Sequence, residues 1–273
     1  MHDSIIAFVG GGNMASALIG GLRRGGHEAA RIVVVEPLEV QRERLAREFG
    51  VAAQARGDTR LAAAGIVVWA VKPQSFAEAA SPCATHVAQA LQVSVMAGIR
   101  SEKIASALHI AAGTARIVRA MPNTPALIGR GIAALHASAA VSTAERDAVQ
   151  ALFAPTGSTL WVTREGDLDA VTALSASGPA YVFYFIEAMM QAGAEMGLPP
   201  ESARRLAQAT FAGSAALAMD SPLPPAELRA QVTSKGGTTH AAITSLDESG
   251  VKAAFVRALH AARTRAQELA RGA

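Results

Sequence analysis

The sequence predicts an α/β fold in which a doubly wound parallel sheet is followed by a smaller all-α domain. Three observations lead to this prediction. Short apolar runs alternate with helical segments over residues 1–163, and a glycine-rich turn directly follows the first run. After residue 163 the apolar runs stop, and long helical patterns continue to residue 273. Alternating strands and helices are typical of a parallel sheet, whereas successive helices indicate a separate helical domain.

The sheet is expected from short apolar runs without polar alternation, a pattern typical of strands buried on both faces. The runs are residues 4–9, 32–35, 66–71, 91–96, 117–120, 132–135 and 159–162. Helices are expected between the earlier runs, at 16–22, 38–49, 75–90 and 101–111. Gly50 stands where a left-handed residue would end the second of these helices.

The turn after the first run has the pattern G-x-G-x-x-A, formed by Gly10, Gly12 and Ala15. The first glycine permits a tight turn, the second allows the backbone to approach a pyrophosphate, and the small third residue permits close helix–strand packing. A strand, this turn, a helix, a second strand and an acid follow one another in the expected order. We therefore predict a Rossmann-type dinucleotide site; the alternative is a glycine-rich turn in an unrelated α/β domain.

Glu36 ends the second expected strand, 21 residues after Ala15. A carboxylate there can accept hydrogen bonds from the ribose hydroxyls, and it would repel the 2′-phosphate of NADP. Arg42 and Arg44 lie one turn into the next helix and are close enough in sequence to reach such a phosphate. The sequence therefore leaves the choice between NADH and NADPH open.

Three further polar or glycine-containing turns follow expected strands, at 72–74, 97–98 and 121–123. Ligands of doubly wound sheets bind beyond the carboxyl ends of the strands. Lys72, Gly98 and Asn123 are therefore candidates for contact with cofactor or substrate. An ordinary surface position is the alternative for Lys72.

The second half is expected to be helical, with one long segment at 167–196 that Pro179 kinks or restarts. Its inward face is expected to comprise Leu168, Val171, Leu174, Val182, Phe185, Ile186 and Met189. Further helices are expected at 201–219, 226–231, 240–246 and 251–271. A small helical domain with long apolar faces has too little partner surface within one chain, which favours a homo-oligomer.

A loop rich in glycine and hydroxyl groups, residues 232–239 (V-T-S-K-G-G-T-T), separates two of these helices. Adjacent glycines let backbone N–H groups approach a ligand, and the start of a helix favours an anion. The loop therefore predicts an anion site. The alternative is a helix–helix turn in which Thr and Ser only cap the helix.

Composition excludes several classes of function. The 17% of charged residues are dispersed in sequence, although the formal net charge is +3, which argues against nucleic-acid binding. One cysteine excludes an intrachain disulfide, and the seven histidines show no ligand spacing, so no metal site is expected. No apolar run is long enough to span a bilayer and no signal peptide is visible, so a cytoplasmic location is expected.

Six motifs in order give the chain a resemblance to the pyrroline-5-carboxylate reductases, over essentially its full length. They are F-V-G-G-G-N-M-A at 8–15, V-K-P-Q at 71–74, A-G-I at 97–99, R-A-M-P-N-T-P-A at 119–126, A-L-S-A-S-G-P-A-Y at 173–181 and L-R-A-Q-V-T-S-K-G-G-T-T at 228–239. Ala176 replaces the usual glycine of the family, and Lys235 stands where proline is common. Neither difference removes a functional group.

The resemblance implies hydride transfer from NADPH or NADH to C5 of 1-pyrroline-5-carboxylate, which gives L-proline, the last step of proline biosynthesis. It implies that the catalytic Thr239 places its hydroxyl at the imine nitrogen, and that Ser234, Gly237 and Thr238 hold the substrate carboxylate. The cofactor residues that it implies are Gly10, Gly12, Asn13, Met14, Glu36, Ala70, Val71, Lys72, Pro73, Met96, Ala97, Gly98 and Asn123.

The resemblance also implies two domains, a dinucleotide-binding domain at 1–163 and a helical substrate-binding and dimerisation domain at 164–273. The expected assembly is a dimer, or a decamer of five dimers. Competing predictions are a non-catalytic, dinucleotide-binding redox sensor and another imine or β-hydroxyacid dehydrogenase. The β-hydroxyacid dehydrogenases use a lysine in the first long helix of their second domain, and residues 167–196 contain none.

Overall fold

The computed structural model describes residues 4–111 and 113–272, and these residues form two compact units. The first unit comprises Met1–Ser177 together with Ala262–Ala273, and the second comprises Gly178–Ala261. The boundary expected at residue 163 marks the end of the sheet, whereas the compact units divide 14 residues later, at Ser177. The last residues of the chain belong to the first unit, because they pack beside the turn that follows a sheet strand, next to Gly98.

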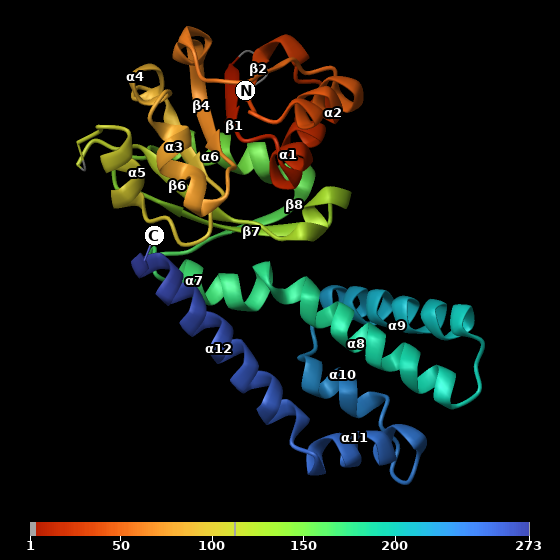
Figure 1. The fold of residues 1–273 in the computed structure, drawn as a ribbon. Helices are drawn as coiled ribbons and strands as arrows, with labels where there is room; N and C mark the ends of the chain where they lie inside the picture. The colour runs from red at the N-terminus through yellow and green to blue at the C-terminus, as the bar shows by residue number, and fades with distance from the viewer. Residues whose placement is uncertain (1–3, 112, 273) are drawn as a thin grey trace. The chain divides into compact units, whose positions relative to one another are not determined.

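An eight-stranded sheet forms the centre of the first unit, with the strand order β3-β2-β1-β4-β5-β6-β7-β8 (Figure 1). Its strands are β1 (Ile5–Val9), β2 (Ile32–Val35), β3 (Ala53–Gln54), β4 (Ala64–Trp69), β5 (Leu91–Ser94), β6 (Ile117–Met121), β7 (Gly131–Ala137) and β8 (Gly157–Trp161). Strands β1 to β6 are parallel to one another. β1 and β4 are neighbours; β2 and β3 follow on the side of β1, and β5 and β6 on the side of β4. The doubly wound α/β fold predicted from the sequence is confirmed.

One part of the sheet differs from the fully parallel arrangement that the alternation predicts. β7 is antiparallel to β6, while β8 is parallel to β7. Only residues 122–130, which contain the short 3₁₀ turn Thr124–Ile128, join β6 to β7. A parallel neighbour requires a crossover of a dozen or more residues, so this short connection can only reverse the chain.

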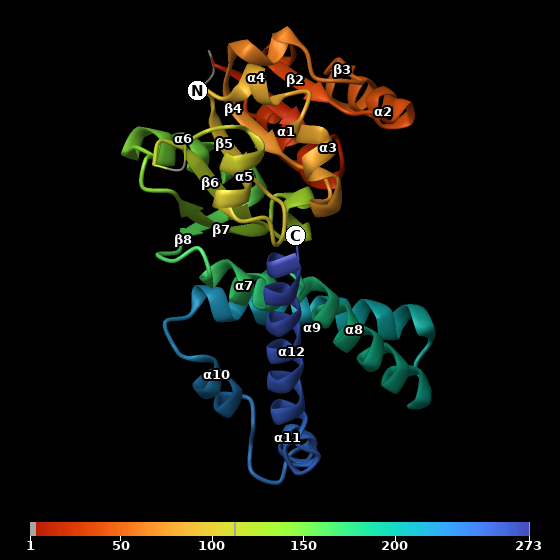
Figure 2. The same cartoon turned by 60° about the vertical axis from the view of Figure 1, so that its left-hand side comes forward.

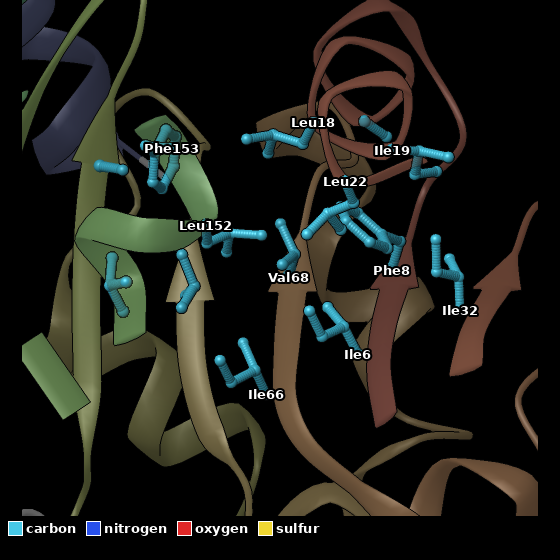
Figure 3. Packing of buried hydrophobic residues seen from close by; sticks show 14 of the residues in the cluster. Ile6, Phe8, Leu18, Ile19, Leu22, Ile32, Ile66, Val68, Leu152 and Phe153 are labelled. Carbon is cyan, nitrogen blue, oxygen red and sulfur yellow. The ribbon is translucent and has the colours of Figure 1, made fainter. Parts of the chain in front are cut away.

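Helices cover both faces of the sheet (Figures 1 and 2). One face packs against α1 (Asn13–Arg24), α2 (Glu39–Phe49) and α6 (Thr143–Phe153), and the other against α3 (Phe76–Ala80), α4 (Ala84–Val87) and α5 (Ser101–Ala107). Figure 3 shows the first cluster, where Leu22 of α1 lies beside Phe8 of β1. In β1, β2 and β4, alternate residues enter the two clusters, which explains the continuous apolar runs of these strands.

Two helices of this unit depart from the sequence-based expectation. The segment expected as one helix at 75–90 is broken between α3 and α4, where Pro82 cannot donate a helical hydrogen bond. α6 was not anticipated. Its signal is a capping box in which Ser142 Oγ accepts from the N–H of Glu145 and Glu145 accepts from the N–H of Ser142.

The long helical segment expected at 167–196 is interrupted just before Pro179. It consists of α7 (Asp167–Val171), a π-helical turn (Thr172–Ala176) and α8 (Gly178–Glu195). Pro179 stands near the start of α8, where its missing N–H leaves no intrahelical bond unmade. The interruption coincides with the boundary between the two compact units.

The second unit contains α8, α9 (Pro200–Asp220), α10 (Pro225–Gln231), α11 (Thr238–Glu248) and the first turns of α12 (Val251–Gly272). Most of its large apolar side chains are exposed, including Phe183 at 59%, Leu217 at 61% and Met219 at 85%. Val182 and Met189, expected to face inward, are each 41% exposed. The helices of one chain therefore do not bury the apolar faces that they carry.

None of the described helices combines the length and the hydropathy that crossing a membrane would require.

Candidate functional site

The glycine-rich turn joins β1 to α1 and has little room at its first position. Gly10 has φ +99°, and its N–H donates to Val35 O at 2.8 Å. A Cβ at Gly10 would lie 2.6 Å from the backbone oxygen of Ala70. Both the positive φ and this close approach require glycine, as the expected tight turn implies.

Gly12 is different, because a Cβ at this position would meet nothing within 4 Å. It is the N-cap residue of α1, and both it and Asn13 are exposed. The first N–H groups of a helix have no intrahelical partners and favour an anion. The backbone from Gly12 to Met14 therefore offers open space and N–H donors to a phosphate group.

The Glu36 carboxylate is buried and accepts hydrogen bonds from two backbone N–H groups. One oxygen accepts the N–H of Gly11 at 2.8 Å, and the other accepts the N–H of Leu38 at 2.9 Å. Each carboxylate oxygen has a second lone pair, so an additional acceptor role toward a ribose remains chemically open. In the structure, Glu36 joins the glycine-rich turn to the start of α2.

The two arginines that follow Glu36 both point towards this region. Arg42 Nη1 donates to Glu36 O at 3.0 Å and to Pro37 O at 2.6 Å, and Arg44 Nη2 donates to Ser16 Oγ at 2.7 Å. Gln41 Nε2 donates to Gly11 O, a contact that the sequence analysis missed because Gln41 lies 30 residues after Gly11. A positive charge therefore lies at the end of β2, where the 2′-phosphate of a bound NADP would be expected.

The other expected cofactor residues lie at the same edge of the sheet. The register pairs Val9 with Trp69, and Trp69 with Ser94, so the turns that follow β1, β4 and β5 are adjacent. Ala70 and Val71 are partly exposed in the turn after β4, and Lys72 is exposed immediately before Pro73, the first residue of a 3₁₀ turn.

The turn after β5 contains Met96, Ala97 and Gly98. Met96 is only 2% exposed and belongs to a core cluster, so it supports this turn from within the core and is not on the surface as a ligand contact would be. Gly98 has φ +76°, and a Cβ there would lie 3.4 Å from the backbone nitrogen of Ala270.

Asn123 lies in the turn after β6, and both ends of its amide have protein partners. Its Oδ1 accepts the N–H of Ile132 at 3.0 Å, and its Nδ2 donates to Ser175 Oγ at 3.3 Å. Asn123 therefore ties this turn to β7 and to the π-helical turn before α8. Nothing in the sequence indicated this positioning role.

The loop at 232–239 belongs to the second unit and connects α10 to α11. It folds back on itself: the N–H of Gly237 donates to Ser234 O at 3.0 Å, and Gly236 has φ +75°. A Cβ at Gly237 would lie 2.6 Å from Ser234 Oγ. Glycine at 237 therefore lets the Ser234 hydroxyl lie against the start of α11.

Gly237 is the N-cap residue of α11, and Thr238 and Thr239 are its first two residues. Their N–H groups are among those that lack partners within a helix. The structure thus brings Ser234, Gly237, Thr238 and Thr239 together at one helix start, as an anion site requires. The Lys235 side chain is exposed.

The expected site residues form two sets, one in each unit. Those assigned to the cofactor line one edge of the sheet in the first unit, and those assigned to the substrate form the α10–α11 loop of the second. The cofactor set fits a dinucleotide. The space at Gly12 is open to a ligand, and the tight turn at Gly10 packs directly against the residue that follows the neighbouring strand. The residues of the first set would therefore hold a dinucleotide, with its pyrophosphate over the start of α1.

Two family models match the chain. One, described as pyrroline-5-carboxylate reductase dimerisation, covers residues 165–269, and the other, described as NADP oxidoreductase coenzyme F420-dependent, covers residues 5–98. The pyrroline-5-carboxylate reductase of Pseudomonas aeruginosa is 43% identical to the chain over 272 residues, which are 99% of this chain and 98% of that protein. The enzyme of the same name from Mycobacterium tuberculosis is 38% identical over 97% of this chain and 96% of that protein.

Solved structures give the same result. A pyrroline-5-carboxylate reductase from Coxiella burnetii superposes with a TM-score of 0.89 at 34% identity, covering 97% of this chain and 98% of that one. The pyrroline carboxylate reductase of Plasmodium falciparum, solved with NADP bound, has a TM-score of 0.88 at 26% identity and covers 99% of each chain. These likenesses extend over both units, and the chain belongs to the pyrroline-5-carboxylate reductase family.

Proposed function

We propose that the chain reduces 1-pyrroline-5-carboxylate to L-proline with a nicotinamide cofactor. The observation that carries this proposal is the folded α10–α11 loop, which gathers the hydroxyl and N–H groups of Ser234, Gly237 and Thr238 at a helix start, in a chain with full-length family likeness. A cyclic imino acid has one carboxylate and one C=N bond, so it needs one anion site and one hydrogen-bond donor.

The carboxylate would be held by Ser234 Oγ and by the N–H group of Thr238, while Gly237, whose own N–H donates to Ser234 O at 3.0 Å, closes the turn beside them. These groups are close together because Gly237 has no Cβ to displace the Ser234 side chain. Hydrogen bonds from neutral donors to a carboxylate are charge-assisted and therefore stronger than ordinary ones. This grip fixes the orientation of the imine ring.

Thr239 would donate a hydrogen bond from its hydroxyl to the imine nitrogen. Electron withdrawal at nitrogen makes C5 more electrophilic. C=N becomes CH–NH as C5 gains hydride and the nitrogen gains a proton, which comes from water through the Thr239 hydroxyl, so that hydroxyl ends the step unchanged. A bound nicotinamide supplies the hydride to C5. The protein contributes mainly position and polarisation, and the chemistry requires no acidic or metal group.

We further propose that NADPH is the better cofactor. The Glu36 carboxylate already accepts two backbone N–H groups, while Arg42 binds the carbonyls of residues 36 and 37 beside it. A guanidinium at the end of β2 suits a 2′-phosphate better than a hydroxyl. Comparing kcat/KM for NADPH and NADH in the wild type and in Arg42→Gln tests this: the variant should lose activity selectively with NADPH. Equal losses with both cofactors would contradict the assignment.

A homo-oligomer formed through the helical domain completes the proposal. Its support is the dimerisation family model at 165–269 and the exposed apolar side chains of α8 and α9, such as Phe183 and Leu217. Light scattering should detect a dimer or a decamer of five dimers, and a monomer at micromolar concentration would contradict it. We also propose that the cofactor domain and the substrate domain divide functionally at residue 163, and that the protein is cytoplasmic.

The direct test is the loss of NADPH absorbance when the purified protein meets 1-pyrroline-5-carboxylate. Thr239→Val should lower kcat/KM on the order of 10²-fold, because it removes the donor to the imine nitrogen, and it should leave NADPH affinity unchanged. Thr239→Ser keeps the hydroxyl and should retain most of the activity. Wild-type turnover in Thr239→Val would show that this hydroxyl has no catalytic role.

A further inference from the structure

A surface pocket of about 480 Å³ lies in the first unit, outside the sites described above. Its walls come from the start of α5, from the segment around α7, and from the last turns of α12, all of which belong to this unit. The volume lies within the usual range for small-molecule sites. Four arginines and two aspartates line it, so two positive charges remain without an acidic counterpart in the wall.

Each of the two aspartates already forms an ion pair with an arginine. Asp169 accepts from Arg100 Nη2 at 2.6 Å, and Asp167 accepts from Arg164 Nη2 at 2.7 Å. Asp169 is buried, with 4% of its surface exposed, so its pairing with Arg100 forms a fixed inner wall. These carboxylates therefore form no direct ion pair with the remaining guanidinium groups, although the charge of Arg263, after the hydrogen bond and charge of Arg164, helps to lower the pKa of Asp167.

The remaining charges are Arg263 and Arg271 of α12. Neither makes a hydrogen bond or an ion pair with any residue in the described part of the chain. Gln267 also lines the pocket and lies between them. Residues four apart share one helix face, so these three side chains point from α12 into the same pocket.

The spacing of these groups indicates the shape of the ligand. Arg263 and Arg271 are eight residues apart, which corresponds to about 12 Å along a helix axis. A ligand with two anionic groups would be held at one end by each guanidinium, with the Gln267 amide between them. A monovalent anion would satisfy only one of the two.

We propose that this pocket binds a small dianion with two separated anionic groups, gripped by Arg263 and Arg271. Its shared chemistry is a pair of carboxylates or phosphates of metabolite size. The pocket is separate from the glycine-rich turn that would hold the dinucleotide and from the α10–α11 loop, because none of their residues lines it. It adjoins the turn after β5, through Arg100 and Ala270.

Calorimetric titration of the full-length protein with hexane-1,6-diyl bisphosphate and, separately, with suberate, whose anionic groups are far enough apart to reach both guanidinium groups, tests the proposal and distinguishes phosphate from carboxylate ligands. At constant ionic strength, at least one of them should bind once per chain and more tightly than acetate. The double variant Arg263→Gln/Arg271→Gln should weaken that binding by about tenfold or more, since each charge-assisted contact contributes about that factor. Binding at the glycine-rich turn or the α10–α11 loop would be insensitive to this change.

Arg265→Gln is the matched control. Arg265 lies on the same helix, is exposed, and pairs with Glu268 at 2.8 Å outside the pocket. It should leave the affinity unchanged, whereas Gln267→Glu, which adds a negative charge inside the pocket, should weaken it. No binding of either dianion, binding no tighter than that of acetate, or equal weakening by Arg265→Gln and the double variant would overturn the proposal.

Discussion

The carboxylate of Glu36 accepts the backbone N–H of Gly11 at 2.8 Å, and this contact joins the end of β2 to the glycine-rich turn after β1. The acid at this position therefore shapes the turn itself. A bound dinucleotide would meet a turn that is already ordered, so less conformational entropy would be lost on binding.

Glu36→Gln is expected to destabilise the protein by about 1–3 kcal/mol, because one carboxylate oxygen becomes an NH₂ group that faces a backbone N–H. The thermal midpoint should fall. Glu39→Gln is the control, since it removes the same charge from an exposed position at the start of α2. An unchanged midpoint in Glu36→Gln would show that the contact with Gly11 is not needed to order the turn.

Two glycines of the same turn should respond differently to alanine. Gly10→Ala places a Cβ 2.6 Å from the Ala70 oxygen at φ +99°, and it should destabilise the fold by about 1–3 kcal/mol. Gly12→Ala meets nothing within 4 Å, so stability should be preserved while the Cβ enters the space left for the cofactor. Denaturant unfolding and NADPH titration separate the two effects. Normal NADPH affinity in Gly12→Ala would place the pyrophosphate elsewhere.

Gly237→Ala should raise KM for the imine through Ser234. The new Cβ would lie 2.6 Å from Ser234 Oγ and would displace that hydroxyl from the start of α11. A double-mutant cycle with Ser234→Ala checks the mechanism: after Ser234→Ala, adding Gly237→Ala should raise KM much less than it does in the wild type. Fully additive effects on KM would mean that Gly237 acts independently of Ser234.

Acid should weaken the fold in two steps. Burial lowers the pKa of His136 from its usual 6.5, so the unfolded chain takes up this proton first and stability falls as the pH drops below 6.5. Burial alone would raise the pKa of Glu165, but hydrogen bonds from Ser101 and the charge of Arg119 outweigh it and hold the pKa below 4.5. The stability that Glu165 contributes to the fold is therefore present above pH 4.5 and is lost as the pH falls through the pKa of Glu165 in the folded state.

Urea unfolding at a series of pH values measures both steps. His136→Gln should flatten the dependence just below pH 6.5, and Glu165→Gln should flatten it in the more acidic range. Glu165→Gln should also lower stability at neutral pH, because it leaves the buried Arg119, which is 1% exposed, without its anionic partner at 3.1 Å. If the variants kept the wild-type pH dependence, other groups would be responsible for it.

Cys83 should resist thiol reagents in the folded protein. Its side chain is fully buried, and burial raises the pKa of the thiol to about 11, so very little thiolate forms at neutral pH. Labelling with a chromogenic disulfide should be slow in buffer and should become complete in denaturant. Rapid labelling without denaturant would reveal local opening between α3 and α4.

The features that the sequence predicted well depend on neighbouring residues. The apolar run before Gly10 identified a strand, and the spacing to Glu36 identified a Rossmann-type turn. α6 is also encoded locally, in the capping box of Ser142 and Glu145, although the apolar runs on either side of it gave no indication of a helix.

Features that depend on distant residues were not predictable in the same way. The amide of Asn123 is satisfied by Ile132 and Ser175, of which Ser175 lies 52 residues away in sequence. The exposure of Val182 and Met189 depends on surface that one chain does not provide. A single sequence carries no direct signal for such partners.

The return of the chain to the first unit at Ala262 has a consequence for synthesis. The last turns of α12 pack beside Gly98 and emerge from the ribosome only after the complete helical unit. Domains generally fold as units during synthesis, starting from the N-terminus. The turn after β5 therefore stays uncovered until the last turns of α12 have been synthesised.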